Sequence, residues 1–321
     1  MKTRVLLALC ALAMSLALNA GAQGFPSKPL RIIVPYPAGG IVDLMARSVS
    51  DGLATRLGQP VIVEARPGAN ASIGTEAVAR SDPDGHTLLM GTLALAVNPH
   101  LSQVPWHPVD DFTGVAHIGI VANIAAVPAS LGVTDLKSFI ALARSRPGEI
   151  NYVNPGNGSS PHVSTELLQQ LNGIRLTSVP YKGVPPAIAD FLAGAVPFGF
   201  FTVPTVVAHV RSGKARAIAI ASPLRHKDLP DVPTMIEQGF ESSQVNSWYA
   251  FTVPKKTPRA AVERLNAELN AVLATDEAVA RVEKVGGTVV AGWSVDRTTK
   301  MIADEYLRWG EVTRKAGIAA K

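Results

Sequence analysis

The sequence predicts an α/β protein built from two domains. Short apolar runs of strand length alternate with segments of helical periodicity through most of the chain. The chain has 321 residues, which is enough for two domains with cores of their own. A strand, a Gly-rich loop and a helix follow one another once in each half, near residues 30–57 and again near 150–171.

The N-terminus has the pattern of an export signal. Lys2 and Arg4 precede an apolar stretch, 5–18, that is short for a membrane span. Ala20-Gly21-Ala22 is a small-x-small site, so we expect cleavage after Ala22 and a periplasmic product. The single cysteine, Cys10, lies in the apolar stretch without the small preceding residue of a lipoprotein cysteine. The mature chain should therefore lack disulfides, a lipid anchor and Cys-ligated metals.

The charge balance is mildly basic. The sequence has 30 Lys and Arg against 25 Asp and Glu, and removing Lys2 and Arg4 leaves 28 against 25, a net charge of +3. Because no run is rich in Lys and Arg, the composition does not indicate a nucleic-acid partner. It is compatible with a small anionic ligand.

The first strand–loop–helix unit is the most informative stretch. Residues 30–34 read as a buried strand, and Met45, Val49, Leu53 and Leu57 form one apolar helical stripe that Gly58 ends. The loop between them contains two prolines and two glycines, and it leads into a helix N-terminus with unpaired N–H groups. This pattern favours an anion-binding loop without a cation. An ordinary tight connection in an α/β sheet explains it equally well.

The rest of the first half continues the alternation. Strands are expected at 61–63 and 87–90, with helices at 73–80 and through 98–101. This order predicts a parallel sheet with helices on its faces. The apolar stretch 112–127 predicts one or two strands leaving the first domain, and 248–253 predicts the returning strand. We therefore expect lobe 1 to comprise 23–122 plus 250–321, and lobe 2 to comprise 123–249.

The second half repeats the design. Helices are expected at 136–144, 162–171, 185–192 and most of 202–210, and strands at 150–153, 176–179, 196–201 and 217–221. Three C-terminal helices, at 258–273, 277–284 and 295–315, should pack back on lobe 1.

A second small-residue loop precedes the helix expected at His162. In Asn157-Gly158-Ser159-Ser160 the glycine frees the backbone and the hydroxyls add donors, which again favours an anion. Taken alone, the loop is better explained as a helix N-cap in which Ser160 satisfies the helix donors. Ligands of open α/β sheets sit beyond the carboxyl ends of the strands, so two such loops in facing domains shift the balance toward binding.

An ordered set of short motifs spans the mature chain. They are Phe25-Pro26-Ser27-Lys28-Pro29-Leu30-Arg31-Ile32-Ile33-Val34-Pro35-Tyr36-Pro37-Ala38-Gly39-Gly40, Arg66-Pro67-Gly68, Pro83-Asp84-Gly85-His86-Thr87-Leu88-Leu89, Gly156-Asn157-Gly158-Ser159, Val179-Pro180-Tyr181-Lys182-Gly183, Leu229-Pro230-Asp231-Val232-Pro233-Thr234 and Ala316-Gly317-Ile318. Together they resemble the Bug family, the extracytoplasmic solute receptors of tripartite tricarboxylate transporters. The resemblance implies a two-lobed type II periplasmic-binding-protein fold with the ligand cleft between the lobes. It also implies a small carboxylate ligand, which the first-lobe loop holds through backbone groups and ordered waters.

Two departures from the family pattern bear on the ligand. Val42 stands before Asp43 where members often carry Thr or Ser, so the first loop has one hydroxyl fewer. Thr202 stands where amino-acid-binding members carry an Asp that would pair with a ligand ammonium. We therefore expect a di- or tricarboxylate without an ammonium, with or without an aromatic ring. Five aromatic residues offer an apolar wall for it, although core packing is the favoured reading: Phe198, Phe200, Phe201, Trp248 and Tyr249.

The expected ligand contacts come from both loops and their neighbours. Asp43 in a helix first turn also complements the helix dipole. Lys182 is either a partner of a ligand carboxylate or a solvated loop lysine, and the sequence does not separate the two. The residues expected to bind the ligand are Tyr36, Ala38, Gly39, Gly40, Asp43, Thr92, Asn98, Gly158, Ser159, Ser160, His162, Tyr181 and Thr202.

Enzymatic chemistry is not expected. Ser159, Ser160 and His162 are close in sequence but do not form the Gly-x-Ser-x-Gly elbow of a hydrolase. The sequence also lacks a His-Glu-x-x-His metal motif and a dinucleotide-binding Gly-x-Gly-x-x-Gly, so neither a metal nor another cofactor is expected.

The sequence thus predicts a monomeric receptor that captures a carboxylate and delivers it to a membrane permease. A periplasmic sensory receptor that presents its closed form to a sensor kinase would use the same cleft, and the sequence leaves this alternative open.

Overall fold

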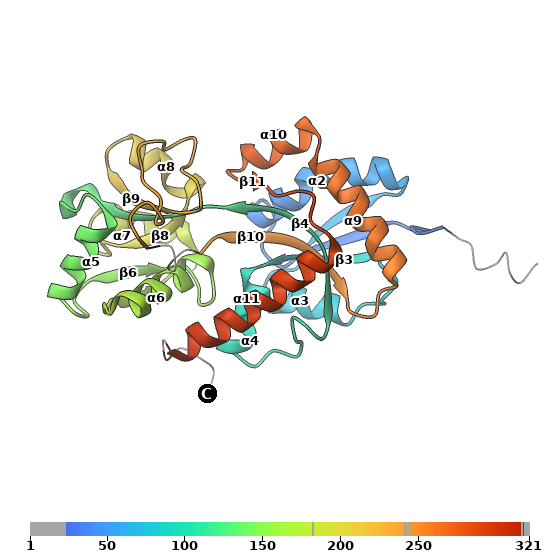
Figure 1. Ribbon diagram of the computed structural model, residues 1–321, viewed down its shortest axis with the longest axis horizontal. Coiled ribbons are helices and arrows are strands. Elements are labelled where there is room, and N and C mark those ends of the chain that lie inside the picture. Colours follow the sequence, from blue (N-terminus) through green and yellow to red (C-terminus); the bar gives the residue numbers. More distant parts are fainter. Residues whose placement is uncertain (1–23, 182, 241–242, 244, 316, 318–321) are drawn as a thin grey trace, which may run out of the picture.

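A computed structural model describes residues 24–181, 183–240, 243, 245–315 and 317. The described chain forms two lobes, each with a sheet and helices, and two long strands run between them (Figure 1). The predicted signal peptide, 1–22, and Lys182 lie outside the described residues.

Lobe 1 is built on a six-stranded sheet with the order β11-β4-β10-β3-β1-β2. Strands β1 to β3 are parallel, as predicted, but β10 runs antiparallel to both β3 and β4. The predicted parallel arrangement thus holds for β1 to β3, and the returning strand, whose direction was not predicted, makes the sheet mixed. The reason is that β10 returns from lobe 2, and a returning strand runs opposite to the β4 strand that leaves. The strands are β1 (Leu30–Val34), β2 (Val61–Ala65), β3 (Thr87–Thr92), β4 (Phe112–Val121), β10 (Ser247–Pro254) and β11 (Thr288–Val289).

Helices cover both faces of this sheet (Figure 1). On one face lie α2 (Ile41–Leu57), α9 (Arg259–Leu273) and α10 (Asp276–Lys284), and on the other lie α3 (Ser72–Ala79), α4 (Leu93–Leu101) and α11 (Val295–Lys315). The predicted stripe of α2, from Met45 to Leu57, is buried against the first face. Gly58 ends α2 with a φ of 66°, a conformation that glycine adopts without strain.

Lobe 2 contains a three-stranded sheet, β8-β5-β9, and a parallel pair, β6-β7. Here β5, the incoming strand, is antiparallel to both neighbours. A parallel bridge between Tyr152 and Phe198 connects the two groups of strands. The elements are β5 (Asn123–Pro128), α5 (Leu136–Ser145), β6 (Asn151–Asn154), α6 (Ser160–Asn172), β7 (Thr177–Pro180), α7 (Val184–Leu192), β8 (Gly199–Thr202), α8 (Val203–Arg211) and β9 (Ala215–Ala221), with a short 3-10 turn at Ala129–Leu131.

The C-terminal helix α11 contacts both lobes. Trp309 and Val312 on α11 share one apolar cluster with Val163 and Leu167 on α6 of lobe 2. In Figure 1 this helix extends from lobe 1 toward lobe 2. The C-terminal helices thus pack on lobe 1 as predicted, and α11 reaches lobe 2 as well.

The five aromatic residues follow the core-packing reading. Phe198 stacks on Phe139 with ring centroids 4.0 Å apart, and Phe200 lies in the same core. Phe201 packs on Phe191 in a second cluster of lobe 2. Trp248 and Tyr249, neighbours on β10, are buried in the clusters on opposite faces of the lobe 1 sheet.

In the described part of the chain, no helix is both long enough and apolar enough to cross a membrane.

Phe198→Ala tests the core of lobe 2. The side chain is fully buried, so its removal leaves a cavity and should cost about 3–5 kcal/mol of stability. The same truncation at Leu224, which is 78% exposed in the same lobe, should change stability by less than about 0.5 kcal/mol. Denaturant unfolding followed by circular dichroism measures both. Equal effects of the two variants would contradict this packing.

Candidate functional site

The first predicted loop joins β1 to α2. Its residues 37–40 are exposed, and Gly40, the N-cap of α2, has no side chain to satisfy the helix donors. The first helical hydrogen bond is donated by the Leu44 N–H to the Gly40 carbonyl, over 3.0 Å. The three preceding N–H groups, of residues 41–43, therefore have no acceptor within the helix. This helix start retains the donors that an anion needs.

The N–H groups of the two glycines serve the loop itself. The Gly39 N–H donates to the Asp43 carboxylate over 3.0 Å, and the Gly40 N–H donates to the Pro37 carbonyl over 3.3 Å. Arg47 also donates to Asp43, over 2.9 Å. Burial raises the pKa of Asp43, but the bonds from Arg47 and Gly39 outweigh it and hold the pKa below its usual value. Asp43 is thus a charged, paired group that supports the loop.

Several side-chain hydroxyl groups lie near this loop, around the start of β10. The Tyr36 hydroxyl lies 3.4 Å from that of Thr92, the residue that pairs with Tyr249 in the sheet. Burial raises the pKa of the Tyr36 hydroxyl and of the Tyr249 hydroxyl, so both groups remain protonated and can donate hydrogen bonds. Two residues before Tyr249, the Ser247 hydroxyl lies 2.5 Å from that of Ser160 in lobe 2. Neutral hydroxyl donors therefore continue across the boundary between the lobes.

The second predicted loop joins β6 to α6. The structure starts α6 at Ser160 and makes Ser159 its N-cap, whose hydroxyl accepts from the His162 N–H. The predicted cap, Ser160, is therefore wrong: Ser160 is the first residue of the helix, and its hydroxyl bonds to Ser247 and Asn123 instead of the helix donors.

Gly158 in this loop has a specific environment. Its φ is +78°, and its N–H donates to the His162 Nδ1 over 3.2 Å. A Cβ at this position would lie 3.0 Å or less from Asn98 and Asn70 of lobe 1. The loop therefore needs glycine both for its backbone and for close contact with the other lobe.

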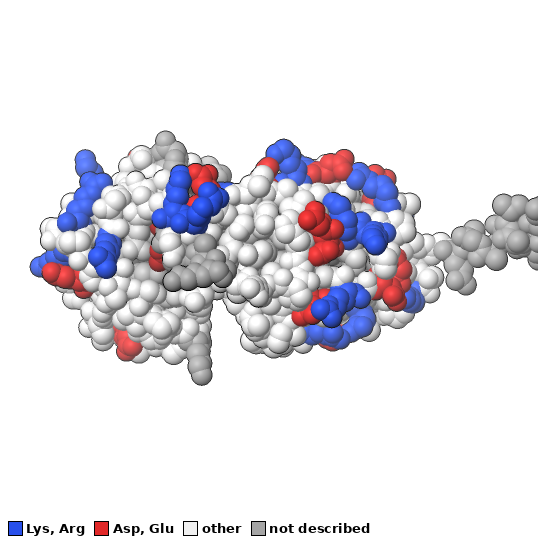
Figure 2. All heavy atoms as spheres, turned by 90° about the horizontal axis from the view of Figure 1, so that it is seen from below, with Lys and Arg blue, Asp and Glu red and all other residues white. Residues whose placement is uncertain are grey.

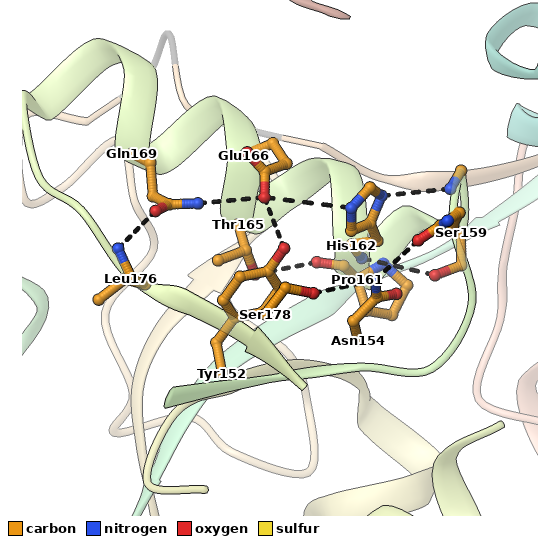
Figure 3. A network of polar contacts seen from close by, with 12 residues as sticks. Tyr152, Asn154, Ser159, Pro161, His162, Thr165, Glu166, Gln169, Leu176 and Ser178 are labelled. Carbon is orange, nitrogen blue, oxygen red and sulfur yellow. Dashed lines mark hydrogen bonds and ion pairs between the residues drawn. The ribbon is translucent and has the colours of Figure 1, made fainter. Parts of the chain in front are cut away.

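A buried polar network supports the second loop from behind (Figure 3). The ring of His162 accepts from Gly158, and its Nε2 lies 4.0 Å from Glu166. Glu166 accepts from the Tyr152 hydroxyl over 2.5 Å and from Gln169 over 3.2 Å. Burial lowers the pKa of His162 to about 4 and raises that of Glu166. His162 is thus a neutral support of the loop.

The other predicted residues of lobe 2 have local partners. The Tyr181 hydroxyl donates to Asp190 over 2.7 Å, and its pKa is raised to about 12 by burial and by that carboxylate. Thr202 precedes α8, and its hydroxyl lies 3.5 Å from that of Thr205. Both residues are partly exposed at the carboxyl-end loops of lobe 2, where they stay predicted ligand contacts.

Three residues near these loops were not considered from the sequence. Ser247 on β10 and Asn123 on β5 lie where the sequence shows only apolar strand patterns. Tyr249 was considered only as part of an apolar wall and not for its hydroxyl. Asn70 lies in the small-residue loop before α3, and its amide bonds to Asn98 over 2.9 Å. The glycine and proline content of that loop was the signal that could have identified Asn70.

Two cavities lie elsewhere at the lobe boundary. One, of about 310 Å³, is lined by His117, Asn246, Trp248 and Glu305, and the other, of about 300 Å³, lies between 222–227 and 283–288. Apart from Trp248, one of the five aromatic residues, no residue considered for ligand contact lines either cavity. The predicted ligand residues lie on loops at the facing edges of the two sheets.

Charged side chains near the loops are paired. Arg47 bonds to Asp43, and Arg66 bonds to Glu64. On the face shown in Figure 2, basic and acidic side chains lie side by side, without a broad field of one sign. Within the described residues, no cluster of three or more His, Cys, Asp or Glu has the arrangement of a metal site.

Comparison with known proteins identifies the family. Residues 45–318 match the family described as "Tripartite tricarboxylate transporter family receptor". The chain is 36% identical to Protein BugT of Bordetella pertussis over 309 residues, which cover 95% of this chain and 94% of BugT. The chain belongs to the tripartite tricarboxylate transporter receptor family. The predicted resemblance to the Bug family is confirmed.

Solved structures give the same answer for the fold of the receptor. An R. palustris protein solved with adipate is 31% identical, with a TM-score of 0.79, and covers 92% of the receptor and 99% of that chain. MatC from Rhodopseudomonas palustris, solved with bound malate, is 30% identical, with a TM-score of 0.76 and coverages of 90% and 99%. The predicted periplasmic-binding-protein fold is therefore confirmed. The receptor is a solute-binding protein and not an enzyme.

The His162–Gly158 contact predicts a pH dependence of stability. His162 has a folded pKa of about 4 against about 6.5 in the unfolded chain, so the unfolded chain binds the extra proton between these values. The contribution of neutral His162 to the free energy of unfolding is fully present above pH 6.5 and is lost as the pH falls toward 4. His162→Asn keeps a hydrogen-bond acceptor but removes the titration. We expect the slope of unfolding free energy against pH, between pH 4 and 6.5, to decrease by up to about 1.4 kcal/mol per pH unit.

Urea unfolding at a series of pH values measures that slope. His117, which is also buried and has its pKa lowered to about 4, provides a matched control in lobe 1. His117→Asn should reduce the slope independently, and the two changes should add. An unchanged slope in His162→Asn would show that this ring has the same pKa in the folded and the unfolded protein, which would contradict the predicted shift.

Proposed function

We propose that this receptor captures a small aliphatic di- or tricarboxylate without an ammonium group and delivers it to the membrane permease of a tripartite tricarboxylate transporter. We further propose that it acts as a monomer in the periplasm, after cleavage of the signal peptide behind Ala22. The ligand would lie between the lobes, whose boundaries we place at 122/123 and 249/250.

One observation carries the proposal: both lobes face the boundary with neutral hydrogen-bond donors. Lobe 1 offers the free N–H groups at the start of α2 and the hydroxyls of Tyr36 and Thr92. Lobe 2 offers the Ser160 N–H at the start of α6, because Pro161 has no N–H and the His162 N–H already bonds to Ser159, and the Ser247 hydroxyl lies beside Ser160. A helix N-terminus carries about half a positive charge, so two of them suit a ligand with a carboxylate at each end.

The relatives support this class of ligand. Adipate and malate, the ligands named for two solved relatives, are aliphatic dicarboxylates without an amino group. The identities of 31% and 30% and the coverage of nearly the whole chain make the comparison direct.

The surroundings of the loops disfavour an ammonium group. Thr202 supplies a hydroxyl where a cation would need a carboxylate. The nearby acidic side chains are already engaged, since Asp43 bonds to Arg47 and Asp190 accepts from Tyr181. An aromatic ligand is also less suitable, because Phe198, Phe200 and Phe201 are packed in the cores of lobe 2.

Binding would act on the equilibrium between separated and closed lobes. A carboxylate that contacts both helix starts interacts with the closed form more strongly than with the open form, and it therefore shifts the population toward closure. Because hydroxyls and backbone groups hold the ligand, without an unpaired Lys or Arg in the described loops, release would not require breaking a direct ion pair.

A calorimetric titration of the purified protein tests the ligand class. Adipate, malate, succinate and citrate represent the proposed class, terephthalate tests an aromatic ring and glutamate tests an ammonium. We expect at least one of the first four to bind at least about 100-fold more tightly than glutamate, since a buried ammonium without a partner is costly. Tight binding of glutamate alone would contradict the proposal.

Gly158→Ala tests the contact between the second loop and lobe 1. A Cβ there would lie 2.9 Å from the Asn70 amide nitrogen, so it should hold the lobes apart and weaken carboxylate binding by about tenfold or more. Gly173→Ala is the matched control, because Gly173 also has a positive φ, 59°, but open space around its Cβ position. Calorimetry and thermal melting of both variants separate loss of closure from backbone strain. Equal affinities in the two variants would exclude a role for this contact.

A further inference from the structure

The loop between β2 and α3 has an unusual backbone. Three successive residues, none of them a glycine, have positive φ values: 45° at Ala69, 48° at Asn70 and 73° at Ala71. Asparagine tolerates this region better than most residues. The conformation brings Asn70 to the edge of lobe 1, where the second loop of lobe 2 approaches.

The side-chain amide of Asn70 bonds to both lobes. Its Nδ2 donates to the Asn98 Oδ1 over 2.9 Å within lobe 1. The same Nδ2 donates to the backbone carbonyl of Asn157 in lobe 2. An amide nitrogen carries two hydrogens, so one of them serves each lobe.

Asn98 holds Asn70 in place. The Asn98 Nδ2 donates to the Asn70 carbonyl over 2.5 Å and lies 3.4 Å from the Ser72 hydroxyl. Asn98 is only 3% exposed, so its two polar atoms are oriented by the fold. The pair of amides therefore forms a rigid unit of lobe 1 with one donor directed at lobe 2.

The acceptor on lobe 2 is also fixed. The Asn157 side chain accepts from Asn154 over 2.9 Å, and the Gly156 N–H donates to the Asn154 side chain over 3.0 Å. Gly158, the next residue, packs directly on Asn70 and Asn98. Donor and acceptor are thus held in position before the lobes meet, which keeps the entropic cost of the bond small.

We propose that Asn70 is a closure latch, a positioning residue whose hydrogen bond to Asn157 forms only when the lobes close. Asn98, predicted from the sequence to contact the ligand, orients the latch. The latch acts on closure itself and not on the choice of ligand. The role of the latch in retaining a carboxylate rests on the proposed function. The effect of the latch on lobe closure does not require that function.

A second contact between the lobes is an exposed ion pair, which should stabilise closure less than the Asn70 hydrogen bond. Lys227 and Glu283 form an ion pair of 2.5 Å, but their side chains are 62% and 45% exposed. Exposed pairs of this kind contribute little because water screens them. The Asn70–Asn157 bond is exposed as well, but its donor and its acceptor are each held by further hydrogen bonds. Forming it therefore costs less side-chain entropy than joining two long, flexible charged side chains.

The test uses two substitutions that keep the backbone conformation available. Asn70→Asp has nearly the same shape but replaces the donor with a carboxylate that faces two oxygen atoms. Asn70→Gly removes the side chain without strain. Asn151→Asp is the matched control, because the Asn151 amide also donates to a backbone carbonyl, that of Ala195, but within lobe 2.

The position of the lobes is measured by single-molecule fluorescence energy transfer. The mature sequence has no cysteine, so dyes can be placed by Asp82→Cys on lobe 1 and Arg146→Cys on lobe 2, both exposed positions. Each protein is observed without ligand and with saturating adipate, malate or citrate, and ligand dissociation is followed by stopped flow. Thermal melting of the free proteins monitors the fold.

We expect both Asn70 variants to have a smaller closed fraction than the wild type and to release a bound carboxylate about five- to tenfold faster, whereas Asn151→Asp behaves as the wild type. The melting midpoints of the free proteins should stay close together. A changed closed fraction without binding of any carboxylate would support the latch and overturn the proposed function. Equal closed fractions and release rates in all proteins, or a wild type that never closes, would overturn the latch.

Discussion

The antiparallel pairing of β4 with β10 is the interaction on which the rest of the structure depends. It joins Phe112–Val121 to Ser247–Pro254, two segments more than a hundred residues apart in the chain, over eight paired positions. Strand β4 leaves lobe 1 and β10 returns to it, so this pair of strands connects the two lobes (Figure 1). The pairing also places Ser247 and Tyr249 between the loops of the two lobes, next to Ser160 and Thr92.

The chemistry between the lobes follows from this arrangement. Each lobe places the carboxyl-end loops of its strands, and the helices that begin there, at the common boundary. The donors that remain there are backbone N–H groups and neutral hydroxyls, because the nearby charges of Asp43, Arg47 and Arg66 are already paired. A receptor has to bind its solute and also release it, and neutral donors on two separate bodies meet both needs.

Much of the fold could be predicted because it is encoded locally. The α2 stripe ending at Gly58, the strands of each half and the three C-terminal helices depend on patterns within a few residues, and all are present. The antiparallel direction of β10 depends on which lobe the chain comes from, which no local pattern records. The N-cap of α6 is Ser159 and not Ser160, because Ser160 bonds to distant Ser247.

The sequence by itself determined the family, the α/β class and the two loops that begin with small residues, because motifs and periodicity are properties of neighbouring residues. Only the tertiary structure decided what each side chain does. In the folded chain His162 accepts a hydrogen bond from Gly158 and supports its loop in the neutral form, and Asn98 bonds to Asn70. Phe198 and Phe200 are packed into a core. These roles depend on partners that are far away in the chain, and a hydrogen bond or a packing contact exists only once folding has brought both partners together.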